Sequence, residues 1–320
     1  MARNMVQFQK GLSEADFRKL YGQEAQCLAL VVAWRWPHGF DCPECGGCKH
    51  CVIKPSRSYP RGLFQCNECK RQTSPIAGTI FASTKLPLKV WFRAMHHMTQ
   101  TKQGISSIEL GRRLGTTQTT AWKIKHKLAQ VMMERDELKP LDGRVEMDDA
   151  YPGGERSGGK RGRGAPGKMP IITAVETTKD GKPVRLKIRR IKRFAKNEVK
   201  ALAGKILKKS ATVVTDGLAC FSGVAEAGCT HVPIIVAKAA DHSEKLACFR
   251  WVNTTPGNIK SAITGTYRAV RKHAGRTLAE FEYRFNRRFD LTTIIPRLGY
   301  VSVRTQPMPY RLLKLTEDGA

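Results

Sequence analysis

Cysteine pairs are the clearest candidates for chemistry in this chain. Cys42 and Cys45 form one CxxC pair, and Cys66 and Cys69 form a second pair farther along. Two such pairs at this separation supply four thiolates that surround one Zn²⁺ ion tetrahedrally, as in a zinc ribbon. The sequence therefore predicts a structural zinc site in a small N-terminal module, which a bound ion stabilises whether or not the module contacts a partner.

A third CxxC pair leaves the choice of zinc ligands open. Cys48 and Cys51 lie on the same segment as the first pair. We favour Cys42 and Cys45, because the third pair lies closer to the strand-like return of the chain and is consistent with spare thiols. Zinc ligation by Cys48 or Cys51 in place of Cys42 or Cys45 stays an alternative.

Acidic residues end two β-rich runs and suggest a second kind of metal site. Glu146, Asp148 and Asp149 close the first run, and Asp216 closes a later one. Carboxylates at strand ends are held in place by the sheet, and two that converge can bind Mg²⁺ or Mn²⁺ through oxygen ligands. That arrangement serves two-metal phosphoryl transfer. An Asp-Gly pair alone indicates only a turn, but an acidic cluster is costly in a chain with 56 Lys and Arg unless a metal or substrate requires it.

The overall charge points to nucleic acid as a partner. The 320 residues carry 56 Lys and Arg against 27 Asp and Glu, a formal net charge of +29. Such an excess of positive charge attracts a phosphate backbone, so we expect double-stranded DNA as the partner. A hydrophobic content of 41% is enough for folded domains. No signal-like start and no long apolar run is present, so we expect a cytoplasmic protein that contacts no membrane.

Helices are expected on both sides of the cysteine pairs. The sequence predicts two helices at 13–21 and 24–34, then a helix after the second pair whose buried side repeats every three or four residues. His96 and His97 lie on this later helix. Consecutive residues of a helix point in different directions, so we interpret these histidines as packing or surface residues and not as metal ligands.

A helix-turn-helix is predicted over residues 104–133. The first helix covers 106–114, Gly115 makes the turn, and the second helix covers 117–128. Apolar residues repeat at helical spacing along one side of the second helix, which leaves its first turns available to a DNA major groove. The residues expected to be exposed there are Gln118, Thr119, Lys123 and Lys125.

From Val145 onward the sequence indicates an α/β domain. Short β-branched runs alternate with turns and with a helix at 196–209, an order typical of a mixed sheet covered by helices. A glycine-rich basic strip at 153–167 lies between the first two strands, where its cations favour contact with phosphates. An amphipathic helix is expected at 277–289.

Several blocks, taken in order, resemble a known family. They are the WPxGxxCPxC stretch from Trp36, the second cysteine pair, the Gly78–Phe81 step, the helix-turn-helix, the VExDD block and the VTDG block. Together they look like bacterial insertion-sequence transposases of the ISXO type, over about residues 35 to 290. The resemblance implies a zinc ribbon and a DDE-superfamily catalytic domain of ribonuclease H-like fold. We therefore expect four parts: a helical lead and ribbon at 1–85, the DNA-binding helices at 86–140, the catalytic domain at 141–295, and a C-terminal tail at 296–320.

The resemblance also implies catalytic residues. It places the first two catalytic carboxylates on Asp148 and Asp216. In the third position, where the family often has Glu followed seven residues later by Lys, this chain has Asn253 and Lys260. An Asn carbonyl can ligate a hard cation, although more weakly than a carboxylate. Pro256 and Gly257 argue against a continuous helix between Asn253 and Lys260, and Glu244 is the alternative third carboxylate.

The implied function is that of a transposase. Such an enzyme binds the terminal inverted repeats of its element and catalyses Mg²⁺- or Mn²⁺-dependent strand cleavage and transfer. We expect it to act as a homo-oligomer on DNA, in association with the bacterial nucleoid. Two other readings stay open: a non-catalytic DNA-binding regulator, which the Asn at the third position favours, and a zinc-ribbon nuclease that does not join strands.

Overall fold

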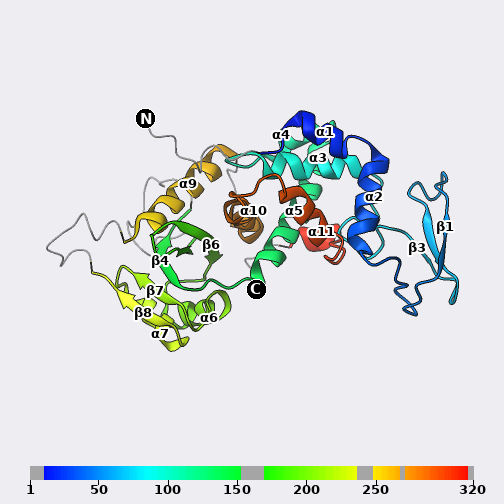
Figure 1. The fold of residues 1–320 in the computed structure, drawn as a ribbon. Helices are drawn as coiled ribbons and strands as arrows, with labels where there is room; N and C mark the ends of the chain where they lie inside the picture. The colour runs from blue at the N-terminus through cyan, green and yellow to red at the C-terminus, as the bar shows by residue number, and fades with distance from the viewer. Residues whose placement is uncertain (1–10, 153–168, 236–247, 267–270, 316–320) are drawn as a thin grey trace. The chain divides into compact units, whose positions relative to one another are not determined.

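The structure, a computed structural model, describes residues 11–152, 169–235, 248–266 and 271–315 (Figure 1). The basic strip at 153–167 and the alternative carboxylate Glu244 lie outside these residues. The chain divides into two compact units. Unit 1 comprises Met1–Thr101, Ser107–Val131 and Phe289–Leu315, and unit 2 comprises Lys102–Ser106, Met132–Arg288 and Thr316–Ala320. The four-part division expected from the sequence stays a prediction about which segments fold independently.

Unit 1 contains a small antiparallel sheet and a group of helices. The sheet has the order β1 (His50–Ile53), β2 (Leu63–Cys66) and β3 (Gln72–Thr73). The two helices predicted ahead of it are confirmed as α1 (Glu14–Tyr21) and α2 (Glu24–Arg35). The other helices are α3 (Leu88–Thr99), α4 (Ser107–Leu114), α11 (Ile294–Ser302), α12 (Tyr310–Leu313), and α5 (Gln118–Glu137), whose last residues belong to unit 2.

Aromatic packing joins α1 to α3. The ring of Phe17 lies 4.6 Å from that of His96, and Tyr21 lies 5.3 Å from Phe92. His96 is buried, and its Nε2 lies 2.9 Å from the carbonyl oxygen of Leu12. The histidine therefore packs in the helical core, in line with its interpretation from the sequence.

The segment expected as a C-terminal tail contains helical structure that packs within unit 1. Helix α11 contacts α2 and α3, and Ile294, Ile295 and Leu298 are fully buried. Gly299 faces the Trp34 ring so closely that a Cβ atom at this position would lie 2.1 Å from it. A side chain there would collide with the indole, so this glycine allows α11 to approach α2.

Unit 2 is built on a five-stranded mixed sheet in the order β6-β5-β4-β7-β8. The strands are β4 (Arg144–Ala150), β5 (Ile171–Thr177), β6 (Pro183–Arg190), β7 (Thr212–Thr215) and β8 (Thr230–Pro233). Strands β4, β5 and β6 are antiparallel neighbours, whereas β7 runs parallel to β4 and β8 runs parallel to β7. The mixed α/β class predicted from the sequence is confirmed.

Helices cover both faces of this sheet (Figure 1). On one face, α6 (Lys196–Ile206) and α7 (Gly223–Glu226) pack on Val145 and Met147. On the other, α9 (Arg250–Thr266) and α10 (Ala274–Asn286) share a core with residues that include Ala150 and Val214. Successive residues of a strand point to opposite faces. Residues of β4 therefore divide between the two cores, with Glu146, Asp148 and Ala150 on the face covered by α9.

Among the described residues, no helix is both long and apolar enough to span a bilayer.

Candidate functional site

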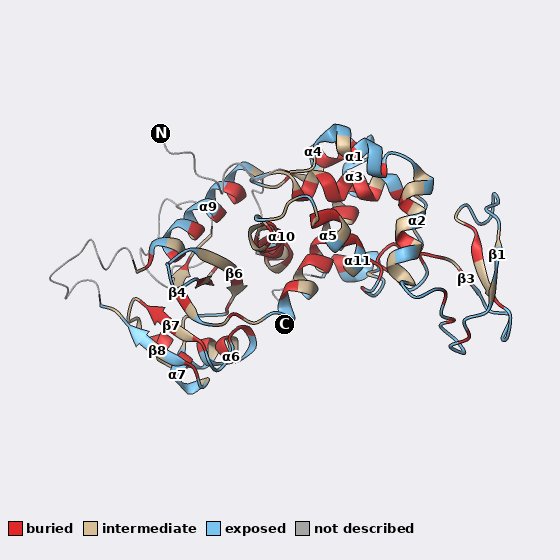
Figure 2. Cartoon of the chain, in the orientation of Figure 1, coloured by how far each residue is buried: buried red, intermediate tan, exposed pale blue. Residues whose placement is uncertain are grey.

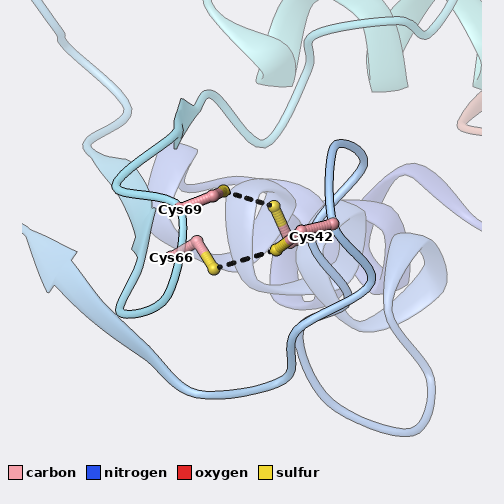
Figure 3. A group of neighbouring side chains, drawn as sticks. Cys42, Cys66 and Cys69 are labelled. Atoms are coloured by element: carbon pink, nitrogen blue, oxygen red, sulfur yellow. Dashed lines mark hydrogen bonds between the residues drawn. The ribbon is translucent and has the colours of Figure 1, made fainter.

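Four cysteines of unit 1 bring their sulfur atoms together. The Sγ atoms of Cys42, Cys45, Cys66 and Cys69 all lie within 4.8 Å of one another. The Sγ atoms of Cys42 and Cys69 are 3.6 Å apart (Figure 3). Those of Cys45 and Cys66 are also 3.6 Å apart. Around Zn²⁺ with Zn–S bonds of about 2.3 Å, the edges of a sulfur tetrahedron measure about 3.8 Å. The spacing of these thiols fits a structural zinc ion, whereas Cys48 and Cys51 are exposed and lie outside this group.

Tight turns set the direction of these thiols. Gly46 has a φ of +72°, and its N–H donates to the carbonyl oxygen of Cys42. Backbone N–H groups of Cys45 and Glu44 donate to the Cys42 sulfur and lower the pKa of this thiol to about 7. At Cys42 the turn therefore favours the thiolate, which is the form that binds zinc.

Acidic residues of unit 2 converge at the ends of two neighbouring strands. In the parallel pair β4 and β7, Glu146 lies opposite Val214. Asp148 and Asp216 each lie two residues farther on, at the carboxyl ends of their strands. One carboxylate oxygen from each of Asp148, Asp149 and Asp216 lies within 4.8 Å of the others. Partly exposed carboxylates at this spacing fit a hard divalent cation.

Backbone groups hold two of these carboxylates. The N–H of Asp149 donates to Asp148 Oδ1 at 2.8 Å, and the N–H of Leu218 donates to Asp216 Oδ1 at 3.0 Å. Gly217, with a φ of +83°, makes the turn that allows the second bond. The residue before Asp216, Thr215, is bonded through its hydroxyl to Nε2 of His231 on β8 at 2.9 Å. The strand ends therefore present the two carboxylates in fixed positions.

Glu146 belongs to the same sequence motif but lies apart from the cluster. Its side chain is 2% exposed, and its Oε2 accepts hydrogen bonds from the N–H groups of Trp251 and Val252 at the start of α9. Its Oε1 lies 2.9 Å from Nη1 of Arg144. The sequence identifies Glu146 only as an acidic neighbour of Asp148, and its contact with α9 joins residues more than 100 positions apart in the chain.

Helix α9 carries the residues expected in the third catalytic position. It runs without a break through Pro256, so the expectation of an interrupted helix is wrong. Proline lacks the N–H that would bond to the carbonyl of Val252. The helix persists because its first turn is bonded to Glu146 and its apolar side, which includes Ile259 and Ile263, is buried against the sheet.

Asn253 and Lys260 lie on one side of this helix. Both are exposed, and seven residues correspond to about two turns, so they point in similar directions. Figure 2 shows buried and exposed residues alternating along α9. Asn253 follows the two residues bonded to Glu146, on the face of the sheet where Asp148 lies.

The helix-turn-helix forms as expected, but one of its four candidate residues is buried. Gln118 and Thr119 are exposed at the start of α5, and Gln118 Nε2 donates to Ser107 Oγ on α4 at 2.9 Å. Lys123 is half-buried, with its Nζ 4.5 Å from the ring centroid of Tyr310.

Lys125 is only 4% exposed, so the expectation that it faces a groove is wrong. It lies one helical turn from Ala121 and from Ala129, both of which are buried. Helix α5 is therefore buried over a wider arc than the single apolar stripe read from the sequence.

Comparison with known proteins identifies two domains in this chain. The ISXO2-like transposase domain matches residues 140–286, and the transposase zinc-ribbon domain matches residues 22–72. A protein of Halobacterium salinarum, described as an uncharacterized protein in transposable element ISH50, is 24% identical over 223 residues. That alignment covers 65% of this chain and 72% of the relative.

The matched ranges contain the four-cysteine cluster and the acidic cluster. The mixed sheet of unit 2 is accordingly the ribonuclease H-like fold of DDE transposase domains. The chain belongs to the insertion-sequence transposases of the ISXO type, with a zinc ribbon ahead of a DDE domain.

Proposed function

We propose that this protein binds the terminal inverted repeats of an insertion sequence and catalyses metal-dependent cleavage and transfer of the DNA strands. The observation that carries the proposal is the convergence of Asp148 and Asp216 at the ends of β4 and β7, within the matched transposase domain. Asp149 adds a third oxygen donor to the cluster.

The roles of the individual residues follow from their chemistry. Asp148 and Asp216 hold Mg²⁺ or Mn²⁺ through carboxylate oxygens, and Asn253 completes the site through its amide carbonyl. The chemistry supplied by such ions is activation of a water or 3′-hydroxyl and stabilisation of the leaving oxygen. Lys260, two turns along the exposed side of α9, contacts a substrate phosphate.

The proposal also assigns the residues that hold zinc and those that contact DNA. Cys42, Cys45, Cys66 and Cys69 hold one structural Zn²⁺, a role supported by their mutual distances. Gln118, Thr119 and Lys123 contact DNA from the start of α5, assisted by the net charge of +29. The active form is a homo-oligomer on element ends, associated with the nucleoid.

A strand-transfer assay tests this proposal. The full chain is incubated with Mg²⁺, a DNA fragment that carries the element's ends, and a plasmid target. We expect the cut ends to be joined to the plasmid. Cleavage without joining would support the alternative interpretation, a zinc-ribbon nuclease that does not join strands.

A second candidate, a non-catalytic DNA-binding regulator, is favoured by one observation: the third position holds the neutral Asn253. Specific binding of the ends with no cleavage in either Mg²⁺ or Mn²⁺ would support it.

A further inference from the structure

Glu146 connects the strand that carries Asp148 to the helix that carries Asn253. The N–H groups of Trp251 and Val252 donate to Glu146 Oε2 at 3.0 and 3.1 Å. The first N–H groups of a helix have no partner within the helix, and they form the positive end of its dipole. A buried carboxylate at this point satisfies two of them and is itself stabilised by them.

Arg144 strengthens the connection from the same face of β4. Its Nη1 lies 2.9 Å from Glu146 Oε1 and donates to Thr177 Oγ1 on β5, and its Nη2 donates to the carbonyl oxygen of Cys248 at 2.9 Å. Arg144 therefore binds the backbone just before α9, and Glu146 binds the backbone of its first turn. The indole N–H of Trp251 adds a bond to the carbonyl oxygen of Gly181 at 2.6 Å.

These bonds leave Glu146 poorly suited to bind a cation. One oxygen accepts from Arg144, the other accepts two backbone N–H groups, and the side chain is 2% exposed. A buried carboxylate is tolerated when such charge-assisted bonds replace water, and the same bonds compete with a metal for its lone pairs. Asp148, two residues farther along, lies in the acidic cluster, whereas Glu146 does not.

We propose that Glu146 is a positioning residue: it fixes the first turn of α9 on β4 and so aligns the amide of Asn253 with Asp148 and Asp216, without ligating the catalytic cation. The inference rests on the proposed function for the role of Asn253. The anchoring of α9 by itself does not require that role, so the two parts can be tested separately.

Hydrogen exchange tests the anchoring. Exchange of the backbone amides at 249–255 is followed by mass spectrometry in the zinc-loaded full chain without Mg²⁺ or DNA. For Glu146→Ala we expect exchange in this segment to be faster by about tenfold or more, because the first turn of α9 opens more often. Glu176→Ala is the matched control, since Glu176 is a mostly buried carboxylate on β5 that pairs with Arg185 and bonds to no residue of α9 in the described part of the chain. Unchanged exchange in Glu146→Ala would overturn the proposal.

A double-mutant cycle tests whether Glu146 acts through Asn253. Mn²⁺ binding is measured by calorimetry in the wild type, Glu146→Gln, Asn253→Ala and the double variant. Gln keeps an acceptor oxygen for the helix but loses the charge, so it is the conservative change. We expect Glu146→Gln to raise the Kd for Mn²⁺ by about threefold or more when Asn253 is present and by less than about twofold in Asn253→Ala.

Equal loss of Mn²⁺ affinity in both backgrounds would show that Glu146 itself ligates the cation and would overturn the positioning role. No loss in either background, together with faster exchange in Glu146→Ala, would confine Glu146 to anchoring and remove the link to Asn253. A wild-type chain that binds Mn²⁺ but cleaves no DNA would contradict the proposed function and leave both results on Glu146 interpretable.

Discussion

Glu146 and Asp148 lie two residues apart on β4, and their side chains leave the same face of the strand, yet they have different partners. Asp148 lies at the strand end, where Asp216 of the parallel neighbour lies beside it. Glu146 lies farther back, under the start of α9, where water is excluded. The position of each carboxylate along the strand therefore decides whether it can reach a hydrated cation.

Asn253 is the residue whose substitution is most informative. If its carbonyl ligates the cation, Asn253→Ala should slow cleavage by about a hundredfold, equivalent to about 2.7 kcal/mol of transition-state stabilisation. Asn253→Asp should retain most of the activity, because it supplies an oxygen ligand. Cleavage rates in Mg²⁺ provide the measurement, with Asn258→Ala, an exposed asparagine elsewhere on α9, as the control. Full activity in Asn253→Ala would remove this residue from the site and direct attention to Glu244.

Zinc content distinguishes the competing cysteines. Cys66→Ser should lose the metal, because three thiolates bind the ion less tightly than four and the ribbon has only a small core of its own, built around Phe40, Cys42 and Cys66. Cys51→Ser should keep one Zn²⁺ per chain, since Cys51 is exposed and outside the cluster. Elemental analysis of both purified variants is the measurement. Stoichiometric zinc in Cys66→Ser would mean that the ligands are wrongly assigned.

Residue types and spacing could predict part of each site. Two CxxC pairs indicate zinc from the sequence alone, and carboxylates after β-rich runs indicate a metal site once parallel neighbours are assumed. The role of Glu146 could not be predicted, because its partners follow it by more than 100 residues and bond through backbone N–H groups, which every residue except proline carries.

At the scale of helices and strands, burial against neighbours overrides local signals. Pro256 in the sequence indicates a break in the helix, but α9 is continuous because it is anchored at its start and packed along its length. The sequence predicts that Lys125 is exposed. It is buried, because α5 is covered around more of its circumference than its apolar stripe indicates. Glu282 on α10 is 1% exposed and lies 2.6 Å from the partly buried Arg189 on β6, an ion pair that periodicity cannot reveal. Hydrophobic spacing located the helices well, since it reflects the buried side directly.

Helix α3 makes the stability of unit 1 depend on pH. Burial, together with the positive charge of the neighbouring His96 and Arg113, lowers the pKa of His97 to about 4. In the unfolded chain this imidazole has a pKa of about 6.5. As the pH falls from about 6.5 to about 4, the unfolded state therefore binds the proton first, and the free energy of unfolding declines. This stability is fully present above pH 6.5.

Denaturant titrations at pH 7, 5.5 and 4.5 measure the effect of His97. The decline in the free energy of unfolding should be smaller in His97→Gln, because the side chain no longer titrates. A decline of the same size in both chains would show that other groups are responsible.

Helix α5 gives a prediction for DNA contact. We expect Lys123 to contact phosphate and not to read bases, so Lys123→Ala should weaken binding to end-containing and random DNA equally and reduce the salt slope by about one. Lys209→Ala, an exposed lysine of unit 2 outside the predicted DNA-binding helices, is the control. Binding isotherms at several salt concentrations are the measurement. A loss confined to end-containing DNA would instead assign base readout to Lys123.

Over the whole molecule, positive charge dominates the expected behaviour toward DNA. With a net charge of +29, the chain should bind DNA mainly through phosphate contacts, and log affinity should fall by roughly 0.9 per neutralised phosphate for each unit of log salt. Fluorescence anisotropy between 50 and 300 mM salt, on the order of the physiological range, is the measurement. A flat response would contradict an electrostatic basis for binding.

Metal-dependent cleavage tests the central claim most directly. The full chain is incubated with DNA that carries the element's ends, with and without Mg²⁺, beside Asp148→Asn and Asp216→Asn. We predict cleavage at the ends by the wild type only with Mg²⁺ and no cleavage by either variant. DNA binding should be unchanged or slightly tighter in the variants, since each removes a negative charge near the phosphates. Cleavage by either variant at the wild-type rate would contradict the assignment of Asp148 and Asp216 as the catalytic metal ligands.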